Sequence, residues 1–202
     1  MTDFAQHFAG GAAPLWQWQA LCQARPICGA APIKQSTERL IRELLVQRPR
    51  READRNDLRH SRFQLEKGAT PQNLKRGPGG TIDVEFIVQM LQLENGAAHP
   101  AVLSTNNQHA LTALAAAGVL PARVAERLGN SYRFLRRVES GLRLLNTSAR
   151  HDLPADPQQL SQLALLLGHS NPSRLHDQCQ SFMVENRALF DELVAPGDGG
   201  GG

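Results

Sequence analysis

Several kinds of residue are scarce in this 202-residue chain, and their scarcity argues against some classes of protein. Aromatic residues make up 5% of the sequence, too few for a surface that stacks single-stranded bases. No apolar run approaches the roughly 20 residues of a membrane span. The net charge is only +3, and the arginines alternate with acids, as on a solvated helical surface. We therefore expect neither a nucleic acid nor a membrane as partner.

Cysteine is also scarce, and its spacing matches no common site. Five residues separate Cys22 from Cys28, and the third cysteine, Cys179, lies far along the chain. This pattern fits neither a zinc nor a redox motif, so we expect free, buried thiols in a reducing compartment. The N-terminus lacks the basic start and apolar core of a signal peptide, so a cytoplasmic location is expected. The seven histidines are scattered and form no ligand pair on one helix.

Runs of alternating β-branched residues are missing, and apolar residues recur at helical spacing in nearly every segment. Asp156-Pro157 and Asn171-Pro172 have the form of an N-cap followed by proline at the first helical position. The fold class predicted is all-α, a bundle of about seven or eight helices. Seven helical segments are expected, at residues 13–25, 33–47, 81–95, 105–117, 121–147, 155–168 and 170–194, and residues 50–66 are either a surface helix or a flexible connection.

The composition predicts four parts along the chain. We expect N-terminal helices over 1–66, a glycine- and proline-rich loop over 67–80, a helical bundle over 81–195 and a disordered tail over 196–202.

The stretch "KRGPGGTIDVEF" at residues 75–86 carries the strongest chemical signal. Glycines before a helix N-terminus can offer backbone N–H groups to a phosphate, and Lys75 and Arg76 would add charge. No Lys-Ser/Thr follows Gly79 and Gly80, which excludes a Walker A loop. A plain turn into a helix capped by Thr81 would give much the same letters. The residues alone leave both interpretations open.

Two acids follow the glycines, Asp83 and Glu85. Residues two apart on a helix point about 200° away from each other, so both cannot hold one metal ion. One acid could face a site, and the other should pair with an arginine or cap backbone donors. We favour Asp83 for the site because it lies nearer the loop. The arginines of the long helix, Arg133, Arg136, Arg137 and Arg143, could face phosphate or pair internally with Glu126 and Glu139.

Four ordered segments resemble one family. "LKRGPGGTIDVEFIVQMLQL" is similar to the GG-x-x-D-I-E-F signature of bacterial glutamine synthetase adenylyltransferase, the bifunctional adenylyltransferase/adenylyl-removing enzyme. "WQWQALCQARPICG", "LSTNNQHALTALAAAGVLP" and "SYRFLRRVESGLRLL" resemble further helices of that family in the same order. The uridylyltransferase that acts on the PII protein shares the GG-x-x-D element, but the flanking helices fit the adenylyltransferase better.

The resemblance implies transfer of AMP from ATP, with Mg²⁺, to a tyrosine of glutamine synthetase, with PII as a regulator. It implies a nucleotide- or phosphate-binding role for Lys75, Arg76, Gly79, Gly80 and Arg25, and an active-site acid at Asp83 or Glu85.

The family's catalytic strands, with G-S-D-x-D, have no counterpart in this sequence. We therefore expect a C-terminal fragment that follows and lacks the nucleotidyltransferase core, supplies one wall of the active site and is inactive alone. The alternative is a stand-alone helical module that binds glutamine synthetase or a nucleotidyltransferase without chemistry.

Overall fold

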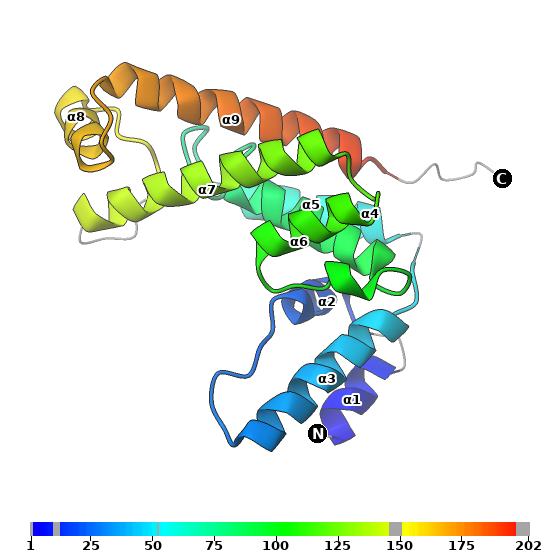
Figure 1. Cartoon of the computed structure of the whole chain (residues 1–202). Helices are drawn as coiled ribbons and strands as arrows, with labels where there is room; N and C mark the ends of the chain where they lie inside the picture. The colour runs from blue at the N-terminus through cyan, green and yellow to red at the C-terminus, as the bar shows by residue number, and fades with distance from the viewer. Residues whose placement is uncertain (1, 10–12, 52, 146–150, 197–202) are drawn as a thin grey trace. The chain divides into compact units, whose positions relative to one another are not determined.

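The computed structural model describes residues 2–9, 13–51, 53–145 and 151–196, and these form helices and loops (Figure 1). The described residues contain no strand, apart from one isolated bridge between Asn73 and Asp152. The all-α prediction is therefore confirmed. The helices are α1 (Thr2–Ala9), α2 (Leu15–Cys22), α3 (Ala31–Gln47), α4 (Asp54–Glu66), α5 (Thr81–Asn95), the 3-10 helix η1 (Pro100–Val102), α6 (Asn107–Ala116), α7 (Ala122–Leu145), α8 (Pro157–Leu166) and α9 (Pro172–Leu193).

Two of the predicted helix starts are confirmed by their side-chain caps. Asp156 accepts a hydrogen bond from the Gln159 amide before α8, and Asn171 accepts from the Ser173 and Arg174 amides before α9. Each cap is followed by a proline, whose fixed φ suits the first helical position. Seven of the nine α-helices in the described part of the chain match predicted helical segments, α4 shows that the open segment 50–66 is largely helical, and α1 is an additional helix.

The described residues divide into two compact units, and the first contains those of 2–61 and 88–126 together with Pro196. In this unit α1 and α2 both contact α3, and α6 contacts η1. Phe8 of α1 packs edge-on against Trp18 of α2, with 4.8 Å between the ring centroids. The apolar side chains of α5 from Val88 onward are buried, as the uncharged segment predicts.

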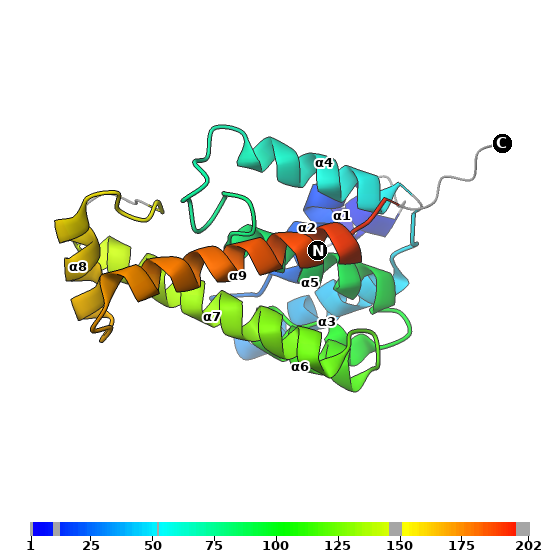
Figure 2. The ribbon, with the colours of Figure 1, turned by 90° about the horizontal axis from the view of Figure 1, so that it is seen from above.

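The second unit contains residues 62–87, 127–145 and 151–195. Here the C-terminal part of α7 and helix α9 run side by side, with α8 at one end of the pair (Figures 1 and 2). One buried apolar cluster joins the loop before α5 to these three helices. Its members are Leu74, Leu135, Val138, Leu142, Leu153, Leu163, Ala164, Leu167, Leu175, Cys179 and Met183.

The three cysteines are free, but they are not all buried. Cys22 and Cys179 are buried, whereas Cys28 is exposed because it lies in the loop between α2 and α3. The predicted free thiols are therefore confirmed, and burial is corrected for Cys28. Residues 197–202 of the predicted tail lie outside the described residues.

No helix in the described ranges combines the length and apolar character needed to cross a membrane.

Candidate functional site

The predicted phosphate loop lies in the second unit, directly before α5, and its backbone donors are already used. Each non-proline N–H from Lys75 to Asp83 donates to an acceptor of the chain itself. The Asn73 side chain accepts from the amides of Lys75 and Arg76, at 3.2 and 2.8 Å. The Gly80 amide donates to the Gly77 carbonyl at 3.0 Å. A ligand at this loop would therefore meet side chains rather than free amides.

The glycines of the loop are required by close packing. A Cβ at Gly79 would lie 1.6 Å from the carbonyl oxygen of Met183 on α9, and Gly79 also has φ of +74°. A Cβ at Gly80 would lie 2.6 Å from the Lys75 carbonyl oxygen, and one at Gly77 would lie 2.6 Å from that of Asn73. Real Cβ atoms do not approach backbone so closely, so this packing accounts for the three glycines without any ligand.

Asp83 is fully buried and holds the loop in place. Its carboxylate pairs with Arg62 of α4, lies 3.1 Å from Arg187 Nε of α9, and accepts the Gly79 amide at 2.8 Å. Arg62 also donates to the Gly77 carbonyl at 2.8 Å. Burial raises the pKa of Asp83, and Arg62, Arg187 and the Gly79 amide oppose that rise.

Of the two acids, Asp83 is thus the one that pairs with arginines and caps backbone donors. The hydroxyl of Thr81 is buried and makes no hydrogen bond within the described residues, so Thr81 is not the cap that the plain-turn interpretation assumed. The side chain of Asp83 caps the start of α5 instead, because it accepts a hydrogen bond from the Gly79 amide.

Glu85 faces the other way, toward α7, and is only partly buried. Its Oε1 accepts a hydrogen bond of 2.8 Å from the hydroxyl of Tyr132. Burial raises the pKa of Glu85, while the Tyr132 hydrogen bond and the nearby charges of Arg136 and Lys75 lower it. Glu85 and Tyr132 belong to two separate sequence segments that resemble the same family, and this hydrogen bond brings them together.

Glu139, one turn beyond Arg136 on α7, completes this cluster. Arg136 Nη1 lies 3.0 Å from Glu139 Oε2, which confirms the predicted internal pairing of Glu139. The Glu139 side chain is only 1% exposed, whereas that of Arg136 is 43% exposed. His151 Nδ1 lies 3.4 Å from the other Glu139 oxygen, and the His151 carbonyl accepts the Leu74 amide at 2.8 Å. The cluster is thus tied to the base of the loop.

We call Lys75, Glu85, Tyr132, Arg136 and Glu139 the Glu85 cluster. Tyr132, Arg136 and Glu139 recur at i, i+4 and i+7, the spacing that places side chains on one face of a helix. Tyr132 is not among the site residues predicted from the sequence, and this helical spacing is the signal that indicates it. Arg76 is exposed, and the predicted roles of Lys75, Arg76, Gly79, Gly80, Asp83 and Glu85 stay predictions.

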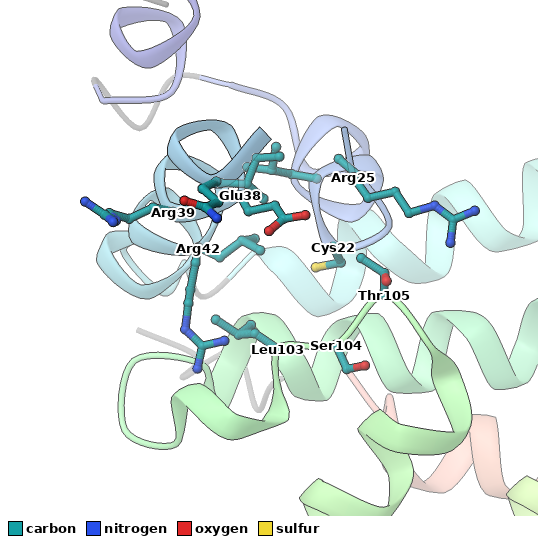
Figure 3. Close-up of a pocket in the computed structure, with 13 residues that line it drawn as sticks. Cys22, Arg25, Glu38, Arg39, Arg42, Leu103, Ser104 and Thr105 are labelled. Carbon is teal, nitrogen blue, oxygen red and sulfur yellow. The ribbon is translucent and has the colours of Figure 1, made fainter. Parts of the chain in front are cut away.

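Arg25 belongs to the first unit, where it is exposed and lines a pocket of about 690 Å³. Figure 3 shows Glu38 pointing into this pocket, while the guanidinium groups of Arg25 and Arg39 point away from its centre. Arg42 donates to the Pro100 carbonyl at 2.8 Å. The arginines do not converge on one point here, and the phosphate role of Arg25 stays a prediction.

The described residues do not assemble a metal site of their own. They contain no group of three or more His, Cys, Asp or Glu side chains placed to hold one ion. Asp83 already interacts with two arginines, and Glu85 with Tyr132. Because Mg²⁺ in phosphoryl-transfer sites is held by carboxylates and phosphate oxygens, these residues do not fit a complete Mg²⁺ site.

Comparison of the sequence with known proteins identifies the family of the chain. Residues 47–194 match the family model described as GlnD PII-uridylyltransferase. Three curated relatives are named bifunctional glutamine synthetase adenylyltransferase/adenylyl-removing enzyme. The protein from Xanthomonas oryzae pv. oryzae is 30% identical over 90% of this chain and 20% of its own length. The proteins from Streptomyces coelicolor and Xanthomonas axonopodis pv. citri are 35% and 39% identical over 77% and 61% of this chain.

The chain spans only a small part of each relative: 20% of the Xanthomonas oryzae protein, 16% of the Streptomyces protein and 13% of the Xanthomonas axonopodis protein. The family model covers most of this chain, including the loop, α5 and the α7 residues of the Glu85 cluster. The chain therefore belongs to the GlnD PII-uridylyltransferase family and, within the proteins compared, is similar to bifunctional glutamine synthetase adenylyltransferase/adenylyl-removing enzymes.

Proposed function

We propose that this chain is the helical part of a nucleotidyltransferase that transfers AMP from ATP to a tyrosine of glutamine synthetase. The hydrogen bond between Tyr132 and Glu85 is the observation that carries the proposal, because it joins two segments that resemble the adenylyltransferase separately. The names of the relatives support adenylyl transfer as the reaction and glutamine synthetase as its protein substrate. In this proposal the Glu85 cluster and the loop before α5 form one wall of the active site.

Phosphoryl-type transfer needs metal ions that neutralise the charge developing on the phosphate. The described residues do not bring enough carboxylates together to hold such ions. We propose that a nucleotidyltransferase domain outside this chain supplies them, and that this chain alone does not transfer AMP. Regulation by the PII protein is part of the same proposal and rests on the family resemblance.

A chimera tests the proposal directly. In the Xanthomonas oryzae relative, the fifth of the protein that aligns with this chain is replaced by this chain, and labelled AMP on glutamine synthetase is measured with Mg-ATP. We expect labelling by the chimera and none by this chain alone. Glu85→Gln in the chimera should reduce the rate, whereas Arg174→Gln, an exposed change on α9, should not.

A well-folded chimera that binds glutamine synthetase but transfers no AMP would contradict the proposal. Together with binding of glutamine synthetase by this chain alone, that outcome would favour a non-catalytic binding module. Labelling of glutamine synthetase by this chain alone would show that its own residues suffice for catalysis.

A further inference from the structure

His151 and Glu139 place two buried polar atoms opposite each other in the second unit. His151 Nδ1 lies 3.4 Å from Glu139 Oε1, and the two side chains are 26% and 1% exposed. Both atoms are buried, and neither makes a hydrogen bond within the described residues. In the described part of the chain, Glu139 is also the only acid within 4.0 Å of the His151 ring nitrogens. Each of the two atoms therefore depends on the other for its pairing.

This burial decides which nitrogen of the imidazole ring carries the proton. Glu139 is ionised, because its second oxygen lies 3.0 Å from Arg136 Nη1 and a guanidinium group is always charged. A carboxylate oxygen can only accept a hydrogen bond, so Nδ1 of His151 must be the donor. A shift of about half an ångström brings the two atoms to the usual N–H···O distance, and leaving both unpaired would be costly. The neutral His151 ring therefore carries its hydrogen on Nδ1.

This tautomer leaves the other ring nitrogen of His151, Nε2, as a base. In a neutral imidazole with its hydrogen on Nδ1, Nε2 holds a lone pair. Nε2 makes no hydrogen bond or ion pair with a described residue, and because Nδ1 is buried, the exposure of 26% belongs to the rest of the side chain. A carboxylate that holds one nitrogen and leaves the other free is the arrangement that orients a histidine general base.

His151 lies beside the residues that the proposed function assigns to the active-site wall. Its carbonyl accepts the Leu74 amide at 2.8 Å, at the base of the loop before α5. Glu139 shares one face of α7 with Tyr132, seven residues before it. Tyr132 in turn donates to Glu85 at 2.8 Å. The base is thus built into the same part of the second unit as the loop and the Glu85 cluster.

We propose that His151 accepts the proton of the tyrosine hydroxyl that attacks ATP, and that Glu139 positions His151 for this step. The inference rests on the proposed function, because it assigns a base to that reaction. A tyrosine hydroxyl has an ordinary pKa of about 10, so at neutral pH its attack needs a proton acceptor. The tyrosine oxygen forms a bond to the α-phosphorus of ATP while the bond from this phosphorus to pyrophosphate breaks. The hydroxyl proton passes to His151 Nε2 and from there to solvent.

The first test measures the tautomer by nitrogen NMR of the histidine rings in the full chain, and it needs no AMP transfer. His176 is the matched internal control, because its Nδ1 also lies 3.4 Å from a carboxylate, that of Asp177, which is 78% exposed. At about pH 8, where an ordinary histidine is neutral, we expect the Nδ1–H form for His151 and the common Nε2–H form for His176. The spectrum of His151→Gln identifies the His151 signals. An Nε2–H form of His151 would overturn the inference.

Glu139→Gln tests the positioning role in the same spectra. Arg136 should hold the carbonyl oxygen of the new amide, which turns the amide NH₂ toward His151 Nδ1. Because Nδ1 would then accept a hydrogen bond, we expect His151 to change to the Nε2–H form. An unchanged tautomer would mean that Glu139 does not position the ring. Thermal unfolding of each variant verifies that it is folded.

The second test measures AMP transfer by the chimera described above. His151→Gln should lower kcat about 100-fold or more, whereas His176→Gln should leave it unchanged. The rate of the original chimera should fall as pH drops from about 8 to 5, the interval in which histidine gains its proton, and His151→Gln should remove that fall. A residue with a merely structural role would lower the rate equally at every pH.

The two tests separate the possible failures. An active chimera in which His151→Gln changes neither kcat nor the pH profile would overturn the base role alone. A chimera that transfers no AMP would overturn the proposed function and the base role with it, whereas the tautomer is decided in the full chain. Where His151→Gln folds poorly, Glu139→Gln takes its place, and an unchanged kcat after the change of tautomer would overturn the inference.

Discussion

Gly79 and Met183 lie in direct backbone contact, although 104 positions separate their numbers in the sequence. A Cβ at Gly79 would be 1.6 Å from the Met183 carbonyl oxygen and 2.8 Å from its Cα. The contact is reinforced by Asn186 of α9, whose Nδ2 donates to the Gly79 carbonyl at 2.9 Å. Asn186 in turn accepts from the Ser131 hydroxyl of α7 at 2.7 Å. The loop is thereby fixed against both long helices of the second unit.

Gly79→Ala should therefore destabilise the fold strongly. The substitution adds a clash with backbone atoms to the strain of a positive φ, and the two together should cost about 2–5 kcal/mol. Gly168→Ala is the control, because Gly168 has nearly the same φ, +76°, with nothing within 4 Å of its Cβ position. It should cost about 1–2 kcal/mol. Urea unfolding measures both, and equal losses would contradict the packing role of Gly79.

Arg62→Met tests the buried ion network. Arg62 is fully buried and interacts with Asp83, Glu66 and the Gly77 carbonyl, so its removal leaves a buried carboxylate with fewer partners. We expect a loss of about 3–5 kcal/mol. Arg127→Met, which breaks an exposed pair with Glu185, should cost less than about 1 kcal/mol. Similar losses for the two variants in urea unfolding would show that the Arg62 network adds no more than a surface pair.

Sequence patterns predicted the helices well because their caps and apolar spacings are local. Helix α1 was missed although Phe4 and Phe8 are four residues apart, as on one helix face. A single pair in eight residues is a weak signal, and Phe8 is buried by its contact with Trp18, which is a tertiary effect. Local patterns cannot supply that contact.

The candidate site was predicted less completely, for the same reason. The sequence indicates the motif at 75–86. It also predicts that one of the two acids of this motif faces a site while the other pairs with an arginine or caps backbone donors. Which acid does so depends on Arg62 and Arg187, which lie 21 residues before and 104 residues after Asp83 in the numbering. Proximity to the loop favoured Asp83 for the site, but long-range packing buries it and leaves Glu85 partly exposed.

The thiols should react very unequally. Burial raises the pKa of Cys22 and of Cys179 to about 12, so both remain protonated at neutral pH. Cys28 is exposed. In the native protein at pH 7.5, we expect a maleimide reagent to modify Cys28 quickly and the other two at least tenfold more slowly, which peptide mass spectrometry can measure. In urea the three cysteines should react at equal rates. Equal rates in the native protein would contradict the burial of Cys22 and Cys179.

Glu85 should make stability depend on pH in a defined direction. Because burial raises its pKa above the ordinary value of 4.5, the folded state binds its proton more tightly than the unfolded state. Folding stability should therefore fall as pH rises from about 4.5 to the raised pKa. Glu85→Gln removes this contribution and keeps an acceptor for Tyr132, so the variant should become progressively more stable than the original chain over that interval. Above the raised pKa the difference in stability should be constant.

Urea unfolding between pH 4 and 8 measures this difference in stability, with Glu192→Gln, an exposed change on α9, as the control. A gap that grows in favour of the original chain would mean that Tyr132, Arg136 and Lys75 stabilise the ionised carboxylate more than burial penalises it.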